Sequence, residues 1–215
     1  LYASYTEIFN PQVNLGADLK PLAPLEGKNY EIGIKSEFFD KKLNSSLALF
    51  KSKQQNVAQI VGYNANNIAI NEGIDANTKG IDFDIAGEML ENLQINAGFT
   101  YLFSIKNNDG DNVKTYTPRR NAVLSTTYKI PTVEGLKVGA SLRWQSDIHE
   151  DNYIRLRQES YAVVNLMASY DINRNWSTAL NVYNLTNEKY LNSLYWTQSY
   201  YGAPRNAMLT LTWKY

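Results

Sequence analysis

The only histidine of the chain, His149, is flanked by carboxylates at Asp147, Glu150 and Asp151. An imidazole beside a carboxylate can activate water as a general base, and carboxylates alone can hold a hard cation. A single histidine among acids in a polar stretch is more often a solvated turn, and no metal-ligand spacing accompanies this one. We therefore predict neither a catalytic residue nor a metal site here.

A second stretch, Asn107–Asp111, carries side-chain oxygens that could bind a cation and resembles the start of a calcium-binding loop. It lacks the bidentate glutamate that closes such a loop, so we expect an ordinary turn. Cysteine is absent, which excludes a disulfide framework, a thiolate nucleophile and a cysteine-ligated zinc site.

Charge and composition narrow the class of protein further. The 215 residues carry 21 basic and 21 acidic side chains, so no positive excess favours nucleic acid as a partner. Tyrosine is unusually frequent at 16, beside seven Phe and four Trp. No apolar run is long enough for a transmembrane helix, but barrel strands give only a weak hydropathy signal.

The dominant pattern is an alternation of apolar and polar residues with a period of two, which is typical of strands. It is clearest in the segments 30–38, 81–85, 93–103, 136–145 and 207–215, and weaker at 43–53, 121–130, 160–170 and 176–185. With the opening residues, it predicts about ten strands.

The connections between these strands alternate in length. Short ones at 39–42, 88–92, 131–135 and 171–175 take turns with long ones at 7–28, 59–78, 105–119, 146–159 and 188–203. Long loops at one end and short turns at the other are typical of outer-membrane β-barrels and uncommon in soluble sandwiches.

Aromatic residues gather where the expected strands end. One set falls near the short turns and another near the long loops: Tyr128, Tyr170, Trp176, Trp213 and Tyr215, then Tyr30, Tyr101, Phe103, Trp144 and Tyr161. Two such girdles are expected at the two interfaces of a bilayer. Because unpaired strand edges are costly in lipid, the ten strands either close on themselves or belong to a larger closed barrel.

Four segments then resemble a known family. Leu1–Gln12, Leu25–Lys35, Asn181–Tyr190 and Tyr201–Asn206 with the tail to Tyr215 resemble, in order, segments of the TonB-dependent ferric-siderophore receptors, notably those for pyoverdine and for ferric coprogen and rhodotorulic acid. That family has a barrel of about 22 strands plugged by an N-terminal domain. The resemblance implies an all-β chain in which residues 1–215 are the last ten or so strands, with the plug, the TonB box and the earlier strands absent.

The resemblance also implies a function. It predicts a receptor in a Gram-negative outer membrane that binds a ferric siderophore outside and imports it with energy from the TonB–ExbB–ExbD complex. It implies no enzymatic step and no cofactor of the protein's own, with iron carried as the chelate. Lipid, lipopolysaccharide and the barrel-assembly machinery are the other expected partners.

Two groups of residues are assigned to these partners. Leu209, Leu211, Trp213 and Tyr215 form the apolar C-terminal face that resembles the barrel-assembly signal. The arginines after Pro118 and Pro204 are expected at the outer interface, where lipopolysaccharide phosphates could meet them.

The siderophore is expected at the long loops, because flat rings pack on a chelate and arginine can bind an anionic complex. The richest loop is 191–202, followed by 146–159. The candidate residues are Tyr195, Trp196, Tyr200, Tyr201, Tyr153, Arg155, Arg157, Tyr116 and Tyr63. Tyrosines in long loops can instead pack the loops together, and this alternative stays open. So do a receptor for haem, cobalamin or another substrate, and a standalone ten-stranded outer-membrane protease that uses His149.

Overall fold

The computed structural model describes residues 1–150, 156–192, 194 and 199–215. Its regular elements are all strands, as the alternation predicted. In the described ranges, no helix is long and apolar enough to cross a membrane.

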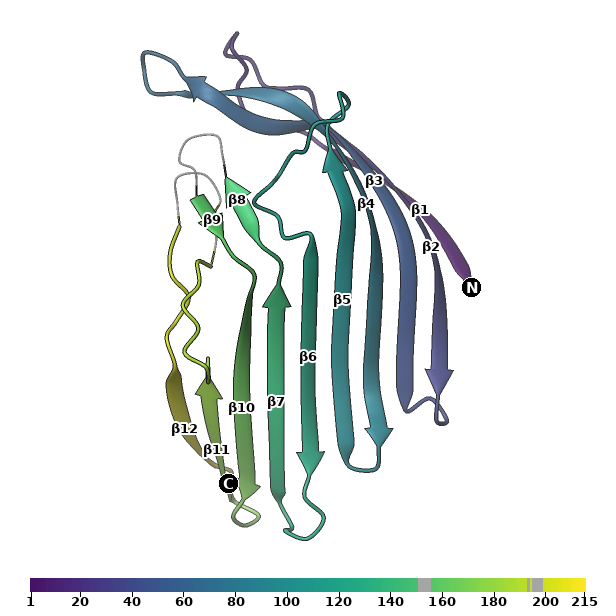
Figure 1. Cartoon of the computed structure of the whole chain (residues 1–215), viewed down its shortest axis with the longest axis vertical. Coiled ribbons are helices and arrows are strands. Elements are labelled where there is room, and N and C mark those ends of the chain that lie inside the picture. The colour runs from purple at the N-terminus through teal and green to yellow at the C-terminus, as the bar shows by residue number, and fades with distance from the viewer. Residues whose placement is uncertain (151–155, 193, 195–198) are drawn as a thin grey trace. The chain divides into compact units, whose positions relative to one another are not determined.

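Ten strands form one sheet in chain order, β1-β2-β3-β4-β5-β6-β7-β10-β11-β12 (Figure 1). Their bounds are β1 Tyr2–Asn10, β2 Leu25–Phe38, β3 Leu43–Tyr63, β4 Ala69–Leu90, β5 Leu93–Lys106, β6 Arg120–Lys129, β7 Leu136–Gln145, β10 Tyr161–Asp171, β11 Trp176–Tyr183 and β12 Asn206–Trp213. Within the described part of the chain the order ends at β1 and at β12, so this sheet is open rather than closed on itself.

The chain forms two compact units. The first comprises Leu1–Ile34, Leu47–Asp82 and Leu102–Lys114, and the second comprises Lys35–Ser46, Phe83–Tyr101 and Thr115–Tyr215.

The short turns fall where the sequence predicted them. Phe39, Asp40 and Lys41 between β2 and β3 have φ values of 54°, 53° and 68°, and Asn92 between β4 and β5 has a φ of 67°. Positive φ lets two antiparallel strands reverse within a few residues. The chain therefore has a short-turn end, to which β2, β4, β6, β10 and β12 descend.

One predicted loop is wrong. Most of 59–78 is strand, since β3 continues to Tyr63 and β4 starts at Ala69. A five-residue connection remains, closed by Asn64, whose amide N–H donates to the Ile68 carbonyl at 3.0 Å. Within 59–78 the apolar residues do not alternate regularly with polar ones, as the adjacent Ile60 and Val61 show, so periodicity could not detect these strands.

The long connection 146–159 also contains strands. β8 (Ile148–Glu150) pairs with β9 (Leu156–Gln158) as a separate two-stranded antiparallel sheet. Three-residue strands are too short to show a period, which is why they were expected as loop.

The register of β7 and β10 corrects the position of one aromatic residue. Tyr161 is opposite Gln145 and Val163 is opposite Arg143, so these four side chains share one face. Trp144 and Ala162 are on the other face. Tyr161 therefore belongs to the charged face and not, as predicted, to the outer aromatic girdle.

Candidate functional site

In the second unit, Tyr161, Val163 and Tyr190 form a small cluster of buried side chains. The rings of Tyr161 and Tyr190 stack, and the guanidinium of Arg143 lies 5.7 Å and 5.4 Å from their centroids. Tyr161 also donates its hydroxyl to Gln145 Oε1 at 3.0 Å. This cluster fastens the segment after β11 to the charged face of β7 and β10.

Asn184, only 3% exposed, organises the start of the same segment. Its amide Nδ2 donates to the carbonyls of Glu188 at 2.8 Å and Ala203 at 3.0 Å, and its Oδ1 accepts from the Glu188 N–H at 2.8 Å. The side chain thus joins the beginning of the last long loop to its end. The sequence around Asn184 does not indicate this role, because the partners of its amide are backbone carbonyls of Glu188 and Ala203.

The two legs of that loop run antiparallel. Leu191 and Tyr201 form a β-bridge, and the Asn192 N–H donates to the Tyr200 carbonyl at 2.8 Å. The Leu191 N–H donates to Gln158 Oε1 at 2.7 Å, so the loop is also tied to β9.

Two predicted binding residues stand on these legs. Tyr200 and Tyr201 are 60% and 62% exposed, with their main chain held by the bridge. The Lys189 Nζ lies 4.7 Å from the ring centroid of Tyr201, which gives this aromatic surface a positive neighbour. The pair can therefore offer a flat ring beside a cation, as binding an anionic chelate would need.

Other predicted residues are more scattered. Arg157 is exposed in β9 opposite His149, and Tyr116 is half-buried in the connection before β6. Tyr63 ends β3 in the first unit with half of its side chain exposed. Four predicted residues, Tyr153, Arg155, Tyr195 and Trp196, are outside the described residues.

Backbone hydrogen bonds hold the two stretches that could have carried chemistry, the one around His149 and Asn107–Asp111. The His149 N–H donates to the Thr115 carbonyl at 3.3 Å, which attaches β8 to the neighbouring connection. The Asp111 N–H donates to Asn107 Oδ1 at 2.8 Å and the Asn107 N–H to the Asp111 carbonyl at 2.9 Å, which makes Asn107–Asp111 the expected turn.

Two loop cations are partly desolvated. Burial lowers the pKa of Lys114, whose Nζ donates to Gln54 Oε1 at 3.1 Å. Burial likewise lowers the pKa of Arg119, and the N–H groups of Arg119 and Arg120 both approach Ser146 Oγ, at 3.1 Å and 3.2 Å. Arg205 reaches back to the Leu185 carbonyl at 3.4 Å through Nη1.

The C-terminal strand continues the apolar face of its neighbour. Its residues Leu209, Leu211 and Trp213 are opposite Leu180, Thr178 and Trp176 of β11, and the two tryptophan rings lie 6.4 Å apart. β12 ends at Trp213, while the Tyr215 ring lies 5.7 Å from that of Trp213. This face has the composition expected of a lipid contact.

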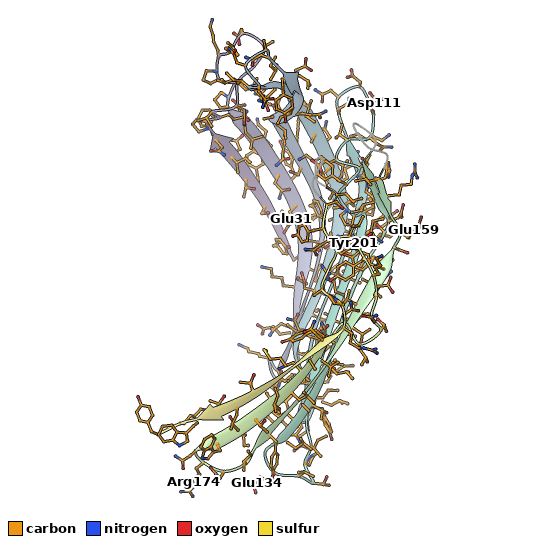
Figure 2. All side chains as sticks on the ribbon, turned by 90° about the vertical axis from the view of Figure 1, so that its left-hand side faces the viewer. Glu31, Asp111, Glu134, Glu159, Arg174 and Tyr201 are labelled. Carbon is orange, nitrogen blue, oxygen red and sulfur yellow. The ribbon has the colours of Figure 1, made fainter. Side chains whose placement is uncertain are left out.

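A hollow of about 660 Å³ lies at the short-turn end of the second unit. Glu134 and Arg174, labelled in Figure 2, are among its polar lining residues. Its mixed charges and open turns give no convergent set of groups, so we assign it no ligand.

These features are typical of the wall and outer rim of an outer-membrane barrel: strands with one apolar and one charged face, short turns at one end, and a long loop held against the strands at the other. Comparison with known proteins agrees. Residues 1–185 match the family model "TonB dependent receptor-like, beta-barrel", and the chain belongs to this family of outer-membrane proteins.

Among its relatives, the chain is similar to the ferripyoverdine receptor of Pseudomonas aeruginosa, with 38% identity over 232 residues that cover 100% of this chain and 28% of that protein. The ferric-pyoverdine BN7/BN8 receptor of Pseudomonas putida is 38% identical over 220 residues, covering 100% of this chain and 26% of that protein. A solved structure of P. aeruginosa FpvA with a heterologous ferric pyoverdine superposes with a TM-score of 0.86 at 36% identity, covering 99% of this chain and 30% of that chain. The chain thus spans less than a third of these relatives.

Proposed function

We propose that this chain is the C-terminal part of a TonB-dependent receptor that binds a ferric siderophore at the cell surface and imports it. The observation that carries the proposal is the match of the whole chain, at 38% identity, to a ferripyoverdine receptor. The open ten-stranded sheet supports the larger barrel, because open edges are not viable in lipid. A standalone ten-stranded protease is therefore disfavoured.

In this function, the chain supplies part of the barrel wall, part of its outer rim and part of the ligand-binding surface. The exposed rings of Tyr200 and Tyr201, the cation of Lys189 and the exposed Arg157 are offered to the ligand by the fastened loop and by β9. Tyr153, Arg155, Tyr195, Trp196, Tyr116 and Tyr63 remain proposed contacts. Iron is cargo within the chelate, and no covalent step is proposed.

The remaining partners belong to the same proposal. Energy would come from the TonB–ExbB–ExbD complex through a plug outside this segment, and the barrel-assembly machinery would read the face of Leu209, Leu211, Trp213 and Tyr215. A haem or cobalamin receptor of the same architecture is the runner-up.

The test is ligand binding by the full-length receptor in detergent, with ferric pyoverdine, hydroxamate and catecholate siderophores beside their iron-free forms. We expect saturable binding of one iron-loaded class, weakened by Tyr201→Ala, Arg157→Gln and Trp196→Ala. Tyr128→Ala removes a tyrosine ring that is 37% exposed near the short turns, and it is the control that should bind normally.

Binding of one ferric class that ignores all three loop substitutions would keep the receptor and reject the proposed contacts. Failure to bind any ferric siderophore, with haem or cobalamin bound instead, would reject the siderophore assignment.

A further inference from the structure

In the parts of β2 to β5 that belong to the first unit, one face of the strands is exposed and largely apolar. In β2, the exposed Ile32 and Ile34 flank the buried Gly33. In β3, Leu47 and Leu49 are 43% and 50% exposed around Ala48, which is 8% exposed. In an outer-membrane protein, such an exposed apolar face contacts lipid.

The same face becomes basic farther along the strands. Lys51 is the next exposed residue after Leu49 in β3, and Lys79 is exposed beside the buried Gly80 in β4. Counted from the short-turn ends of their strands at Leu43 and Leu90, they are the ninth and twelfth residues. A barrel strand crosses the hydrocarbon region in roughly 9–11 residues, so both lysines lie at the outer interface.

Both lysines line one hollow of the surface. A groove of about 510 Å³ is lined by Tyr30, Ile32, Leu49, Lys51, Lys79 and Phe103, and also by Ala3, Ser4, Glu31, Phe50 and Gly80. Besides the two lysines, the lining includes the hydroxyl of Ser4 and the carboxylate of Glu31, which accepts the hydroxyl of Tyr2 at 2.6 Å. The other lining residues are apolar, aromatic or glycine. The groove therefore has an apolar trough with cations at its rim.

The two lysines of the groove differ from a third lysine on the same face, which is ion-paired. Lys28, nearer the long-loop end of β2, is this third lysine. Its Nζ lies 3.4 Å from Glu7 Oε1, and Glu7 also accepts the hydroxyl of Tyr5. Lys51 and Lys79 form no ion pair with any residue that the structure describes. Two ammonium groups at a lipid interface attract an anionic group, and the apolar part of the groove can bury an acyl chain.

We propose that this groove binds a phosphorylated lipid of the outer leaflet, lipopolysaccharide, with a lipid A phosphate between Lys51 and Lys79 and an acyl chain along Ile32, Leu49 and Phe103. The inference rests on the outer-membrane location of the chain and is independent of which siderophore is carried. It differs from the arginines after Pro118 and Pro204, which belong to the second unit.

The experiment is native mass spectrometry of the full-length receptor after delipidation, with diphosphorylated lipid A, its monophosphorylated form, phosphatidylethanolamine and inorganic phosphate as probes. The test variant is Lys51→Gln with Lys79→Gln. The matched control is Lys129→Gln with Lys137→Gln, which removes two lysines that are opposite each other at the short-turn end. A third variant, Leu49→Asn, addresses the acyl chain.

We expect the intact receptor to retain diphosphorylated lipid A in preference to phosphatidylethanolamine. The Lys51/Lys79 variant should lose affinity tenfold or more, since each lysine near an anionic surface contributes about 1 kcal/mol. Leu49→Asn should weaken lipid A and leave any phosphate binding unchanged, and the control should match the parent. Siderophore binding and resistance of the folded barrel to SDS report that each variant is intact.

Three results would overturn the proposal. They are equal retention of lipid A by the Lys51/Lys79 variant and the parent, equal loss in the control, and full displacement of lipid A by inorganic phosphate. The last would assign the lysines to a free anion rather than to a lipid.

Discussion

The ring of Tyr161, from the first position of β10, stacks on the ring of Tyr190, from the last long loop, with centroids 4.4 Å apart and planes inclined by 19°. Both side chains are nearly buried, at 4% and 8% exposure, on a face that in a barrel would meet water. Arg143 covers the pair from β7. The stack therefore fixes the last long loop to the wall of the sheet, and a ligand that bound this loop would have less chain to order.

Replacing Tyr190 with Ala should release this loop from the wall. Removing a large buried aromatic side chain costs about 3–5 kcal/mol, and here the cost should appear as local opening. The Gly202 N–H, which donates to the Tyr190 carbonyl at 2.9 Å, should exchange with deuterium much faster. Tyr190→Phe keeps the ring and should behave as the parent.

Tyr200→Ala is the control for that exchange measurement, because its side chain is 60% exposed. The positioning role would be wrong if Tyr190→Ala left exchange in residues 199–204 at the parental rate.

Adding one methyl group at Gly202 should have a related effect. A Cβ at this position would overlap the ring of Tyr190, whereas a Cβ at Gly62 meets no atom within 4 Å. Overpacking of this kind costs about 1–3 kcal/mol. Limited proteolysis should cleave the last long loop of Gly202→Ala sooner than that of Gly62→Ala, and equal cleavage of both would contradict the contact.

Asn184 and Asn187 allow a matched test of the amide network. Both have left-handed backbones, with φ of 50° and 55°, but Asn184 uses its amide as a donor while Asn187 accepts the Arg205 N–H through Oδ1 at 2.9 Å. Asn184→Asp should leave the carbonyls of Glu188 and Ala203 without their donor and bury a charge. Asn187→Asp keeps its acceptor.

We therefore expect Asn184→Asp to destabilise the loop by about 1–3 kcal/mol per lost buried partner and Asn187→Asp to change little. Hydrogen exchange at Glu188 and Ala203 measures the difference. Similar exchange in the two variants would show that the side chain of Asn184 does not join the ends of the loop.

The sequence predicted the strands because lipid on one side and charge on the other impose alternation, as at Leu142 and Arg143. It missed the ends of β3 and β4 within 59–78, where apolar residues such as Ile60, Val61 and Ile74 do not alternate regularly with polar ones and main-chain pairing defines the strands. It also placed Tyr161 in the aromatic girdle, since tyrosine is common on either face. Register with Gln145, a non-local property, corrects that position.

The candidate site was predicted by composition alone. Aromatic rings and arginines in long loops indicated where a chelate could bind. Composition carries no information about the hydrogen bonds of Asn184 and the β-bridge that hold the main chain near Tyr201. The hydrogen bond between Asn184 and the Ala203 carbonyl joins residues that are far apart in the sequence and meet only after folding. Long-range hydrogen bonds of this type have no period that a sequence could show.

Lys114 gives the last prediction, a pH dependence of local stability. Burial disfavours its charged form and lowers its pKa below the usual 10.5, so the folded state binds fewer protons than the unfolded state between the lowered pKa and 10.5. Stability of the loop should therefore rise with pH across that window and level off above it. Opening free energies of residues 107–119, taken from hydrogen exchange corrected for intrinsic rates, should show the rise in the parent and lose it in Lys114→Gln. If the variant kept the same rise, another group would be titrating and the burial of Lys114 would not be its cause.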